Sequence, residues 1–465
     1  MSDISTIVRS YGGDQFIDEA TLAACGRYQP TIAYPANNLI AQLGDSRTAQ
    51  GGGGLPDAML IAQPKSRAYG YQTHLQNYLH GRVRVPSTVN FGLSGDTSGP
   101  SGSNPGVTSR VANVIASGAA TCIVLCSIND RGSEDRTAAF SIANLEYIVA
   151  TLTAAGIWVI LIPELFKGSA SFPGLTLTGQ QLQNQKDVFA WGMAQTGRVR
   201  VRVVDPRTLL LSNPTNWTWV DSATGDGLHE DLSGAKIIGY DVLGPQVADL
   251  FAQFPGKTFT TANLYDASTN PLGNLLANPL LTGTGGTANG NAGTWADNVT
   301  AITAPSGLTI TGTAGATDPL GRTGCQRIQI TGTPSSGTNP SFQFGISSAT
   351  ANILQGDKLS GYFEIYVAAA TGVLSPANTV MRIVHNTGTP TPYFTQTNEQ
   401  ATNVQGFCDI APYSWFAMID EFTVQTGNTV SATSTYSITP QLLNGTACSL
   451  DIYIRTPFLG KNQYA

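Results

Sequence analysis

Charged residues are scarce in this chain: Asp, Glu, Lys and Arg together make up 12% of its 465 residues. The acidic residues outnumber the basic ones, and the formal net charge is −6 with a pI near 5.2. Because phosphate binding requires a basic surface, we expect no nucleic acid partner. The same charge balance is compatible with neutral ligands such as sugars.

Long apolar runs are absent as well. The N-terminus reads MSDISTIVRSYGGDQ and has no apolar segment of signal-peptide length after a basic start, which predicts no export by the Sec route. The longest apolar stretches, such as Ile157–Ile162, are long enough for a strand but too short to span a bilayer. We therefore expect neither a transmembrane segment nor membrane insertion.

The six cysteines have neither the spacing of a disulfide framework nor that of a metal site. Cys122 and Cys126 lie in an apolar run that reads as a strand. At about 3.3 Å per residue they would be roughly 13 Å apart, too far for a disulfide, so we expect both to be buried strand residues. The second half contains Cys325, Cys408 and Cys448, an odd number without regular spacing.

Short apolar runs alternate with helix-length segments in the first half of the chain. The apolar runs are Asn38–Leu43, Val83–Phe91, Cys122–Ser127, Trp158–Pro163 and Val199–Val204. The helix-length segments are Tyr71–His80, Val107–Ser117, Arg136–Ala155, Gln180–Gln195 and about Leu232–Phe254. This alternation predicts a parallel sheet that is covered by helices on both faces.

The composition changes at about Lys257, where charged residues become rarer and Thr, Gly, Asn and Ser become more common. Short segments with alternating apolar residues follow, separated by polar turns. They are Leu308–Thr311, Cys325–Ile330, Ser341–Ile346, Lys358–Val367, Thr379–Val384, Trp415–Val424, Thr435–Leu442 and Cys448–Ile454. This pattern predicts an all-β sandwich over residues 257–465, after an α/β domain over residues 36–256. Residues 1–35 fit neither domain, and we expect either a packed extension or an attachment segment.

Polar motifs follow three of the predicted strands. Gly44-Asp45-Ser46 comes after the first strand, Leu93-Ser94-Gly95-Asp96-Thr97 after the second, and Ser127-Ile128-Asn129 after the third. Active sites gather at the carboxyl ends of strands in open α/β sheets. Glycine lets backbone N–H groups approach a ligand, and an Asn side chain can donate to a developing oxyanion. Each motif alone is more typical of a simple turn.

A fourth motif, Asp226-Gly227-Leu228-His229, precedes the last predicted helix. An Asp and a His at this spacing can place the carboxylate beside the imidazole, where it fixes the tautomer and supports the imidazolium. The chain has four histidines, and only His229 has an acidic residue at this spacing in a loop expected at the carboxyl edge of the sheet.

The order and the strand-end positions of these motifs resemble blocks I, II, III and V of the SGNH (GDSL) hydrolases, over roughly residues 36–255. The matching residues are Gly44, Asp45 and Ser46 in block I, Gly95 in block II, Asn129 in block III, and Asp226 and His229 in block V. Block III departs from the family at Ser127, where the family usually has glycine. This difference concerns the path of the backbone at Ser127 more than the chemistry, because Asn129 is present.

The resemblance implies a flavodoxin-like α/β sandwich with about five parallel strands. It also implies ester hydrolysis with Ser46 as the nucleophile, His229 as the base and Asp226 as the residue that orients His229. The backbone N–H groups of Ser46 and Gly95 and the side chain of Asn129 would hold the oxyanion. No metal and no organic cofactor is implied.

Several residues are weaker candidates for substrate binding. Arg47 follows the nucleophile, and we expect it either to contact substrate or to form a structural ion pair. Trp217 and Trp219 would share one face of an extended segment, either as a sugar platform or in the core. Aromatic rings in the β domain could stack on sugars. These candidates are Trp295, Tyr393, Phe394, Tyr413 and Trp415, and the alternative for each is a place in the core.

Residues beside the motifs have more local expected roles. Asp45 is expected to serve the hydrogen bonds of its turn. Asp130 and Arg131 are expected either to line the site or to form a surface turn.

Two functions are compatible with these features. One is a carbohydrate O-acetylesterase that acts on an acetylated polysaccharide or other glycan. The other is a phage tail or receptor-binding protein whose esterase trims or holds a bacterial glycan; it would be extracellular or virion-associated and, as a tail protein, a homotrimer. Residues 274–279, NLLANP, loosely resemble the start of jelly-roll modules in glycan-active enzymes and phage tails.

A further alternative is a non-catalytic glycan-binding or structural virion protein on an SGNH scaffold. The complete set of Ser46, Asn129, Asp226 and His229 argues against it.

Overall fold

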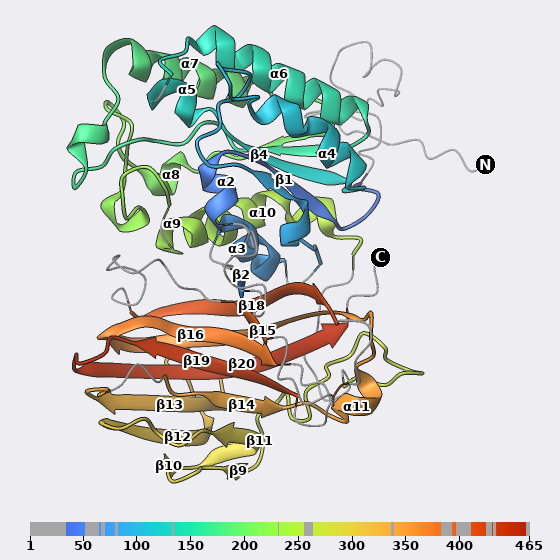
Figure 1. Ribbon diagram of the computed structural model, residues 1–465, viewed down its shortest axis with the longest axis vertical. Helices are drawn as coiled ribbons and strands as arrows, with labels where there is room; N and C mark the ends of the chain where they lie inside the picture. Colours follow the sequence, from blue (N-terminus) through green and yellow to red (C-terminus); the bar gives the residue numbers. More distant parts are fainter. Residues whose placement is uncertain are drawn as a thin grey trace, which may run out of the picture.

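The computed structural model describes residues 34–51, 65–66, 70–79, 82–132, 134–230, 232–254, 264–335, 339–382, 393–396, 411–424, 430 and 434–461. In these ranges the chain forms an α/β half followed by a half made mostly of strands, as Figure 1 shows. The predicted fold class, α/β followed by all-β, is therefore confirmed. Residues 1–33, which contain most of the expected extension, lie outside the described residues.

A five-stranded parallel sheet forms the centre of the α/β half, in the order β3-β1-β4-β5-β6. Its strands are β1 Ile40–Gly44, β3 Asn90–Gly92, β4 Thr121–Leu125, β5 Trp158–Leu161 and β6 Val201–Val203. Successive side chains of a strand point to opposite faces. Accordingly, Ile123 joins the hydrophobic core on one face and Val124 joins the core on the other.

Helices cover both faces of this sheet (Figure 1). They are α2 Ser46–Gly51, α3 Tyr71–Tyr78, α4 Val111–Ala116, α5 Ile128–Gly132, α6 Ala138–Ala154, α7 Gly179–Ala194, α8 Arg207–Leu210, α9 Leu232–Lys236, a π-helical segment Ile237–Leu243, and α10 Gly244–Val247. Helices α4 and α6 contribute Val114 and Leu145 to one core. Helix α3 and the π-helical segment contribute Leu75 and Val242 to the other.

The second strand is shorter than the predicted segment Val83–Phe91. Only Asn90–Gly92 forms β3, and Ser87–Val89 is a 3-10 turn. Pro86 has no backbone N–H, and its carbonyl accepts a hydrogen bond from the N–H of Val89 at 3.1 Å. The proline therefore interrupts the ladder before β3 begins.

Two sheets make up the strand-rich half, in the orders β10-β12-β13-β20-β15-β18 and β2-β17-β16-β19-β14-β11-β9. The strands after residue 264 are β9 Gly285–Thr287, β10 Ala292–Gly293, β11 Trp295–Ala301, β12 Leu308–Ala316, β13 Cys325–Gly332, β14 Phe342–Gly345, β15 Lys358–Thr371, β16 Val373–Arg382, β17 Tyr393–Gln396, β18 Tyr413–Thr423, β19 Thr435–Leu442 and β20 Cys448–Lys461, with a short helix α11 Ala349–Asn352. Each strand segment predicted in this half overlaps one of them. Strand β2, Lys65–Ser66, comes from the first half and pairs with β17.

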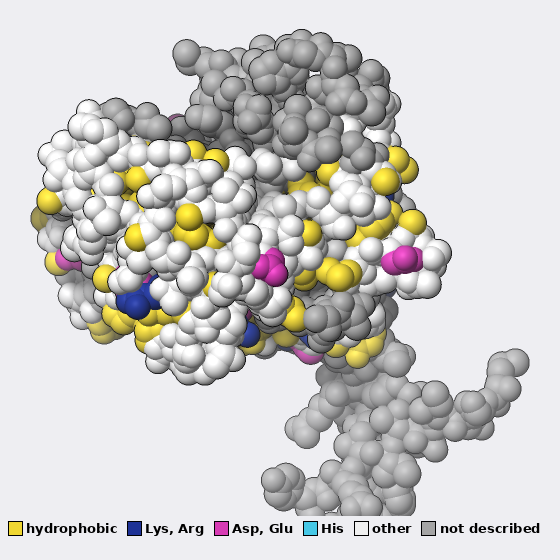
Figure 2. All heavy atoms as spheres, turned by 90° about the horizontal axis from the view of Figure 1, so that it is seen from below, with side chains coloured by type: hydrophobic (Ala, Val, Ile, Leu, Met, Phe, Trp, Pro, Cys, Tyr) yellow, Lys and Arg dark blue, Asp and Glu magenta, His cyan; other side chains and the backbone are white. Residues whose placement is uncertain are grey.

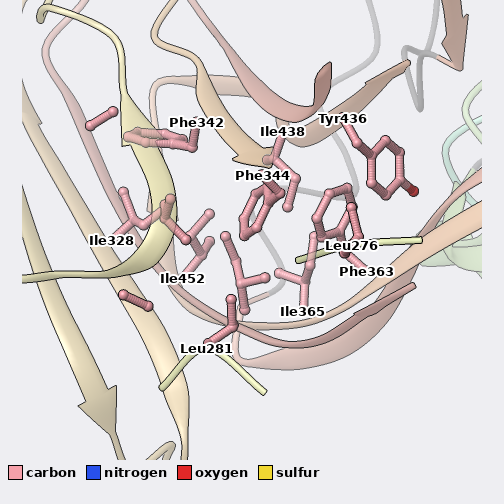
Figure 3. Packing of buried hydrophobic residues seen from close by; sticks show 14 of the residues in the cluster. Leu276, Leu281, Ile328, Phe342, Phe344, Phe363, Ile365, Tyr436, Ile438 and Ile452 are labelled. Carbon is pink, nitrogen blue, oxygen red and sulfur yellow. The ribbon is translucent and has the colours of Figure 1, made fainter. Parts of the chain in front are cut away.

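The core of the strand-rich half lies between its two sheets (Figure 3). Phe344 and Tyr436 come from one sheet and Phe363 from the other. The ring centroid of Phe363 is 4.7 Å from that of Phe344 and 4.3 Å from that of Tyr436. The described members of this core are all distinct from those of the two cores around the parallel sheet, so each half buries its own apolar side chains.

The face of the strand-rich half seen in Figure 2 consists mostly of uncharged groups, with few Lys, Arg, Asp or Glu side chains. Cys122, Cys126, Cys325 and Cys448 are buried free thiols. Within the described ranges, no helix is both long and apolar enough to cross a bilayer.

Candidate active site

The carboxyl ends of β1, β3 and β4 meet at one edge of the parallel sheet. Gly44, the last residue of β1, is in register with Gly92 of β3 and Leu125 of β4. The N–H of Leu93 donates to the carbonyl of Gly44 at 3.1 Å. The turns that follow these strands carry the first three sequence motifs, so the parallel sheet brings the motifs together.

Close packing at this edge requires glycine at two positions. A Cβ on Gly44 would lie 2.1 Å from the carbonyl oxygen of Leu125, and a Cβ on Gly92 would lie 2.4 Å from the backbone nitrogen of Ala49. Because neither side chain is present, α2 can begin directly after β1, with Ser46 as its first residue.

Ser46, His229 and Asp226 form a continuous chain of hydrogen bonds. The Oγ of Ser46 is 2.9 Å from Nε2 of His229, and Nδ1 of His229 is 2.7 Å from Oδ2 of Asp226. The serine is buried, whereas the side chains of His229 and Asp226 are 21% and 54% exposed. Solvent therefore reaches this group from the side of the histidine loop.

The backbone of the histidine loop holds the Asp226 carboxylate in place. Its Oδ1 accepts hydrogen bonds from the N–H groups of Leu228 at 2.8 Å and His229 at 2.7 Å. Burial by itself raises the pKa of Asp226, but these bonds and the bond from the His229 ring outweigh burial and lower the pKa to about 2. The carboxylate is thus ionised at neutral pH, which favours the proton of a neutral imidazole on Nδ1 and leaves Nε2 to accept from Ser46.

The groups predicted to hold an oxyanion lie on adjacent turns. Gly95 is exposed, with φ +78°, and Asn129 is buried. The Nδ2 of Asn129 donates to the carbonyl of Asp96 at 2.9 Å, which ties the third motif to the second. An amide nitrogen carries a second N–H, and within the described residues no acceptor takes it. The oxyanion role of Ser46, Gly95 and Asn129 stays a prediction.

This geometry can move a proton from a serine hydroxyl to an imidazole and so make the serine a nucleophile. Across the described ranges, no group of three or more His, Cys, Asp and Glu side chains could hold a metal ion.

Residues 43–237 match the model of the GDSL-like lipase/acylhydrolase family. This segment is a GDSL hydrolase domain. The match does not extend into the strand-rich half, so the resemblance of that half to jelly-roll or phage tail modules stays a prediction. No curated protein matches the chain.

Several solved structures are similar to part of this chain. They include the carbohydrate acetylesterase Est24 from Sinorhizobium meliloti, with 16% identity over 46% of this chain and 99% of that one and a TM-score of 0.34. The aryl esterase of M. smegmatis has 18% identity over 46% of this chain and 99% of that one, with a TM-score of 0.35. A family 3 carbohydrate esterase from Talaromyces cellulolyticus has 16% identity over 47% of this chain and 99% of that one, with a TM-score of 0.31.

The GDSL domain has a glycine-like backbone conformation at Ser127. Its φ of +93° lies in the region that favours glycine, the residue usual in the family at this position. The Oγ of Ser127 donates to Oε2 of Glu164 at 2.7 Å, and both side chains are buried. Ser127 thus combines an unfavourable φ with a hydrogen bond to a buried carboxyl group. Although serine stands here in place of glycine, the turn still leads into Asn129.

Arg47 is buried, so of the two roles expected for it the substrate contact is wrong. Its side chain is 1% exposed and donates to the carbonyls of Leu228 at 2.9 Å and Phe166 at 2.5 Å. The guanidinium carbon also lies 5.5 Å from the ring centroid of Trp219. Arg47 therefore connects the helix of Ser46 to the loop of His229 from inside the domain.

The neighbouring charged residues are also internal. Asp45 accepts a hydrogen bond from the backbone N–H of Arg47 at 3.1 Å, in agreement with the expected turn role. Asp130 and Arg131 are both fully buried. Asp130 accepts from the hydroxyl of Ser98 at 2.7 Å. Asp130 and Arg131 therefore form neither a surface turn nor a wall of the site.

Three of the tryptophans considered as sugar platforms are core residues, so of their two expected roles the place in the core is confirmed. Trp217 is 8%, Trp219 0% and Trp295 1% exposed. Trp217 has φ +52°, so it is not part of an extended segment, and its ring packs edge-on against Phe189 at 5.1 Å. The side chains of Tyr393, Phe394, Tyr413 and Trp415 lie outside the described part of the chain.

The structure adds Glu164 and Lys167 to this region, and the sequence reasoning missed both. They follow the predicted strand Trp158–Pro163, at the same sheet edge as the recognised motifs. The sequence signal that could have identified them is a pair of charged residues directly after a predicted buried strand. Burial raises the pKa of Glu164 to about 8.

Proposed function

We propose that the GDSL domain is a serine esterase that works through an acyl-enzyme on Ser46. The observation that carries the proposal is the hydrogen-bonded chain from Ser46 through His229 to the ionised Asp226. The serine Oγ attacks the ester carbonyl while its proton passes to Nε2 of His229. The bond to the alcohol then breaks as His229 returns this proton to the leaving oxygen.

A water molecule then attacks the acyl-enzyme with the same proton transfers through His229 and releases the acid. The negative charge on the carbonyl oxygen is held by the N–H groups of Ser46 and Gly95 and by the side chain of Asn129. Loss of one such donor typically costs about 10²–10³ in turnover.

Replacement of the nucleophile tests the proposal. Ser46→Ala is expected to lower the hydrolysis of 4-nitrophenyl acetate at least about a thousandfold, because the acyl-enzyme cannot form. The matched control is Ser335→Ala, which changes an exposed serine of the strand-rich half and should keep full activity. A fluorophosphonate should label the wild type and neither Ser46→Ala nor His229→Ala. An unchanged rate in Ser46→Ala would overturn the assignment.

We further propose that the substrate is an O-acetyl ester of a polysaccharide. The strand-rich half supports this, because its visible face is mostly uncharged (Figure 2) and β2 joins it to the GDSL half through β17. A place in a phage tail or receptor-binding protein, and a trimeric state, remain part of the hypothesis.

The chain length of the acyl group separates this proposal from lipase action. We expect acetate release from acetylated polysaccharides and little hydrolysis of 4-nitrophenyl palmitate, with Ser46→Ala as the blank for both. Efficient cleavage of the palmitate ester without acetate release from any polysaccharide would contradict the carbohydrate assignment and leave the esterase assignment intact.

A further inference from the structure

Lys167 lies between the nucleophile helix and the histidine loop. Its two chain neighbours are held by hydrogen bonds: the carbonyl of Phe166 accepts from Arg47 at 2.5 Å, and the N–H of Gly168 donates to the carbonyl of Gly227 at 2.7 Å. These bonds connect the backbone around Lys167 to the elements that carry Ser46 and His229.

The Lys167 side chain extends to the helix that carries Asn129. A Cβ on Gly132 would lie 2.0 Å from the Nζ of Lys167, so the ammonium occupies the space that a side chain at this position would fill. Gly132 is the last residue of α5 and comes three positions after Asn129. Residues at this spacing share one helix face, with their Cβ positions about 5–6 Å apart. The ammonium is therefore within about one helical turn of the predicted oxyanion donor.

This ammonium is half-buried and has no partner. Among the described residues, no hydrogen bond, ion pair or ring contact involves Lys167. By contrast, four described arginines of the neighbouring segments have partners: Arg47 and Arg131 donate to carbonyl groups, Arg110 pairs with Asp96, and Arg136 pairs with Glu134. Burial, followed by the positive charge of Arg47, lowers the pKa of Lys167.

A partly desolvated charge without a counter-ion is unfavourable, and proteins keep such groups mainly where function requires them. We propose that Lys167 binds an anionic group of the substrate, carried by the glycan close to the scissile ester. This inference rests on the proposed esterase function and narrows its substrate to acidic glycans. An ammonium is a point charge that suits a carboxylate or a phosphate equally, so the test includes both.

Competition against a neutral substrate measures this preference. Inhibition of 4-nitrophenyl acetate hydrolysis is compared for trigalacturonate and galactotriose, and for galactose 6-phosphate and galactose. At least one anionic sugar should have an inhibition constant about tenfold lower than its neutral counterpart, a difference of about 1.4 kcal/mol. Lys167→Gln should remove this difference, and Lys167→Arg, which keeps the charge, should retain most of it.

The matched control is Lys186→Gln, which removes a lysine of α7 whose Nζ already bonds the carbonyl of Thr215. This variant should keep the wild-type preference. Equal inhibition by charged and neutral sugars in the wild type, or an unchanged preference in Lys167→Gln, would overturn the proposal.

Failure of the esterase function would be seen separately. If the wild type does not hydrolyse 4-nitrophenyl acetate, the proposed function fails, and calorimetric titration of the same sugars into the wild type and Lys167→Gln still reports the anion preference. If hydrolysis depends on Ser46 but no charge preference exists, only the role of Lys167 fails.

Discussion

Three carboxyl groups are buried close to Arg47. They are Asp45, Glu164 and Glu230, and all three act electrostatically on its guanidinium. Burial raises their pKa values to about 6, 8 and 7, respectively. The folded protein therefore holds protons on these groups at pH values where the unfolded chain has released them.

The stability of the protein should therefore fall as the pH rises from about 4.5, the ordinary pKa of Glu, to about 8. In this window the folded state binds more protons than the unfolded state, so each unit of pH costs up to about 1.4 kcal/mol per group. Glu164→Gln removes one such group, because the amide stays neutral. We therefore expect the melting temperature of the variant minus that of the wild type to increase as the pH is raised from 5 to 8.5.

The control for this measurement is Glu146→Gln, which changes a carboxylate that is 46% exposed and paired with Arg198. It should keep the pH dependence of the wild type. If the melting temperatures of Glu164→Gln and the wild type change with pH by the same amount, the pKa of Glu164 is not raised in the folded protein.

At the scale of elements, the turn between β4 and α5 carries Ser127 at a positive φ and delivers Asn129 to the site. Two effects oppose each other at this residue. A positive φ in a residue with a Cβ typically costs on the order of 1–3 kcal/mol. The hydrogen bond to the Glu164 carboxyl, which is protonated at neutral pH, contributes roughly 0.5–1.5 kcal/mol.

Two substitutions isolate the backbone strain. Ser127→Ala loses the hydrogen bond and keeps the backbone strain, whereas Ser127→Gly loses the hydrogen bond and relieves the strain. We therefore expect Ser127→Ala to be less stable than Ser127→Gly by about 1 kcal/mol, measured as a difference in melting temperature. A Ser127→Ala variant as stable as Ser127→Gly would show that the turn relaxes and that the strain is absent.

At the scale of the whole molecule, the described residues form separate cores in the two halves. A sheet sandwich and a helix-covered sheet that share no core side chains should unfold as separate cooperative units. The pairing of β2 with β17 joins the halves through backbone hydrogen bonds over only a few residues.

Core substitutions should therefore act on one half at a time. Phe363→Ala removes a fully buried ring and is expected to cost about 3–5 kcal/mol, or roughly 6–20 °C in the melting of the strand-rich half. The temperature at which esterase activity is lost should not change. The matched variant Ile160→Ala, in the parallel sheet, should lower that temperature and leave the other transition in place. A joint shift of both transitions in calorimetry would contradict independent cores.

The sequence by itself determined the order and type of most of the elements in both halves, because apolar periodicity and turn residues act over a few neighbours. It also placed Ser46, Gly95, Asn129 and the Asp226–His229 pair on loops at one sheet edge. The parallel sheet confirms the common edge of the first three motifs through the register of Gly44, Gly92 and Leu125. The catalytic roles of these residues and the domain boundaries stay predictions.

Only the tertiary structure decided which side chains face solvent. Trp217 lies in the core because its φ of +52° breaks the extended path that sequence spacing assumes. Arg47 is buried because carbonyls 119 and 181 residues away accept its hydrogen bonds. Lys167 is near the site because the segment after β5 crosses between α5 and the histidine loop. Such contacts join residues far apart in the chain, and no local pattern encodes them.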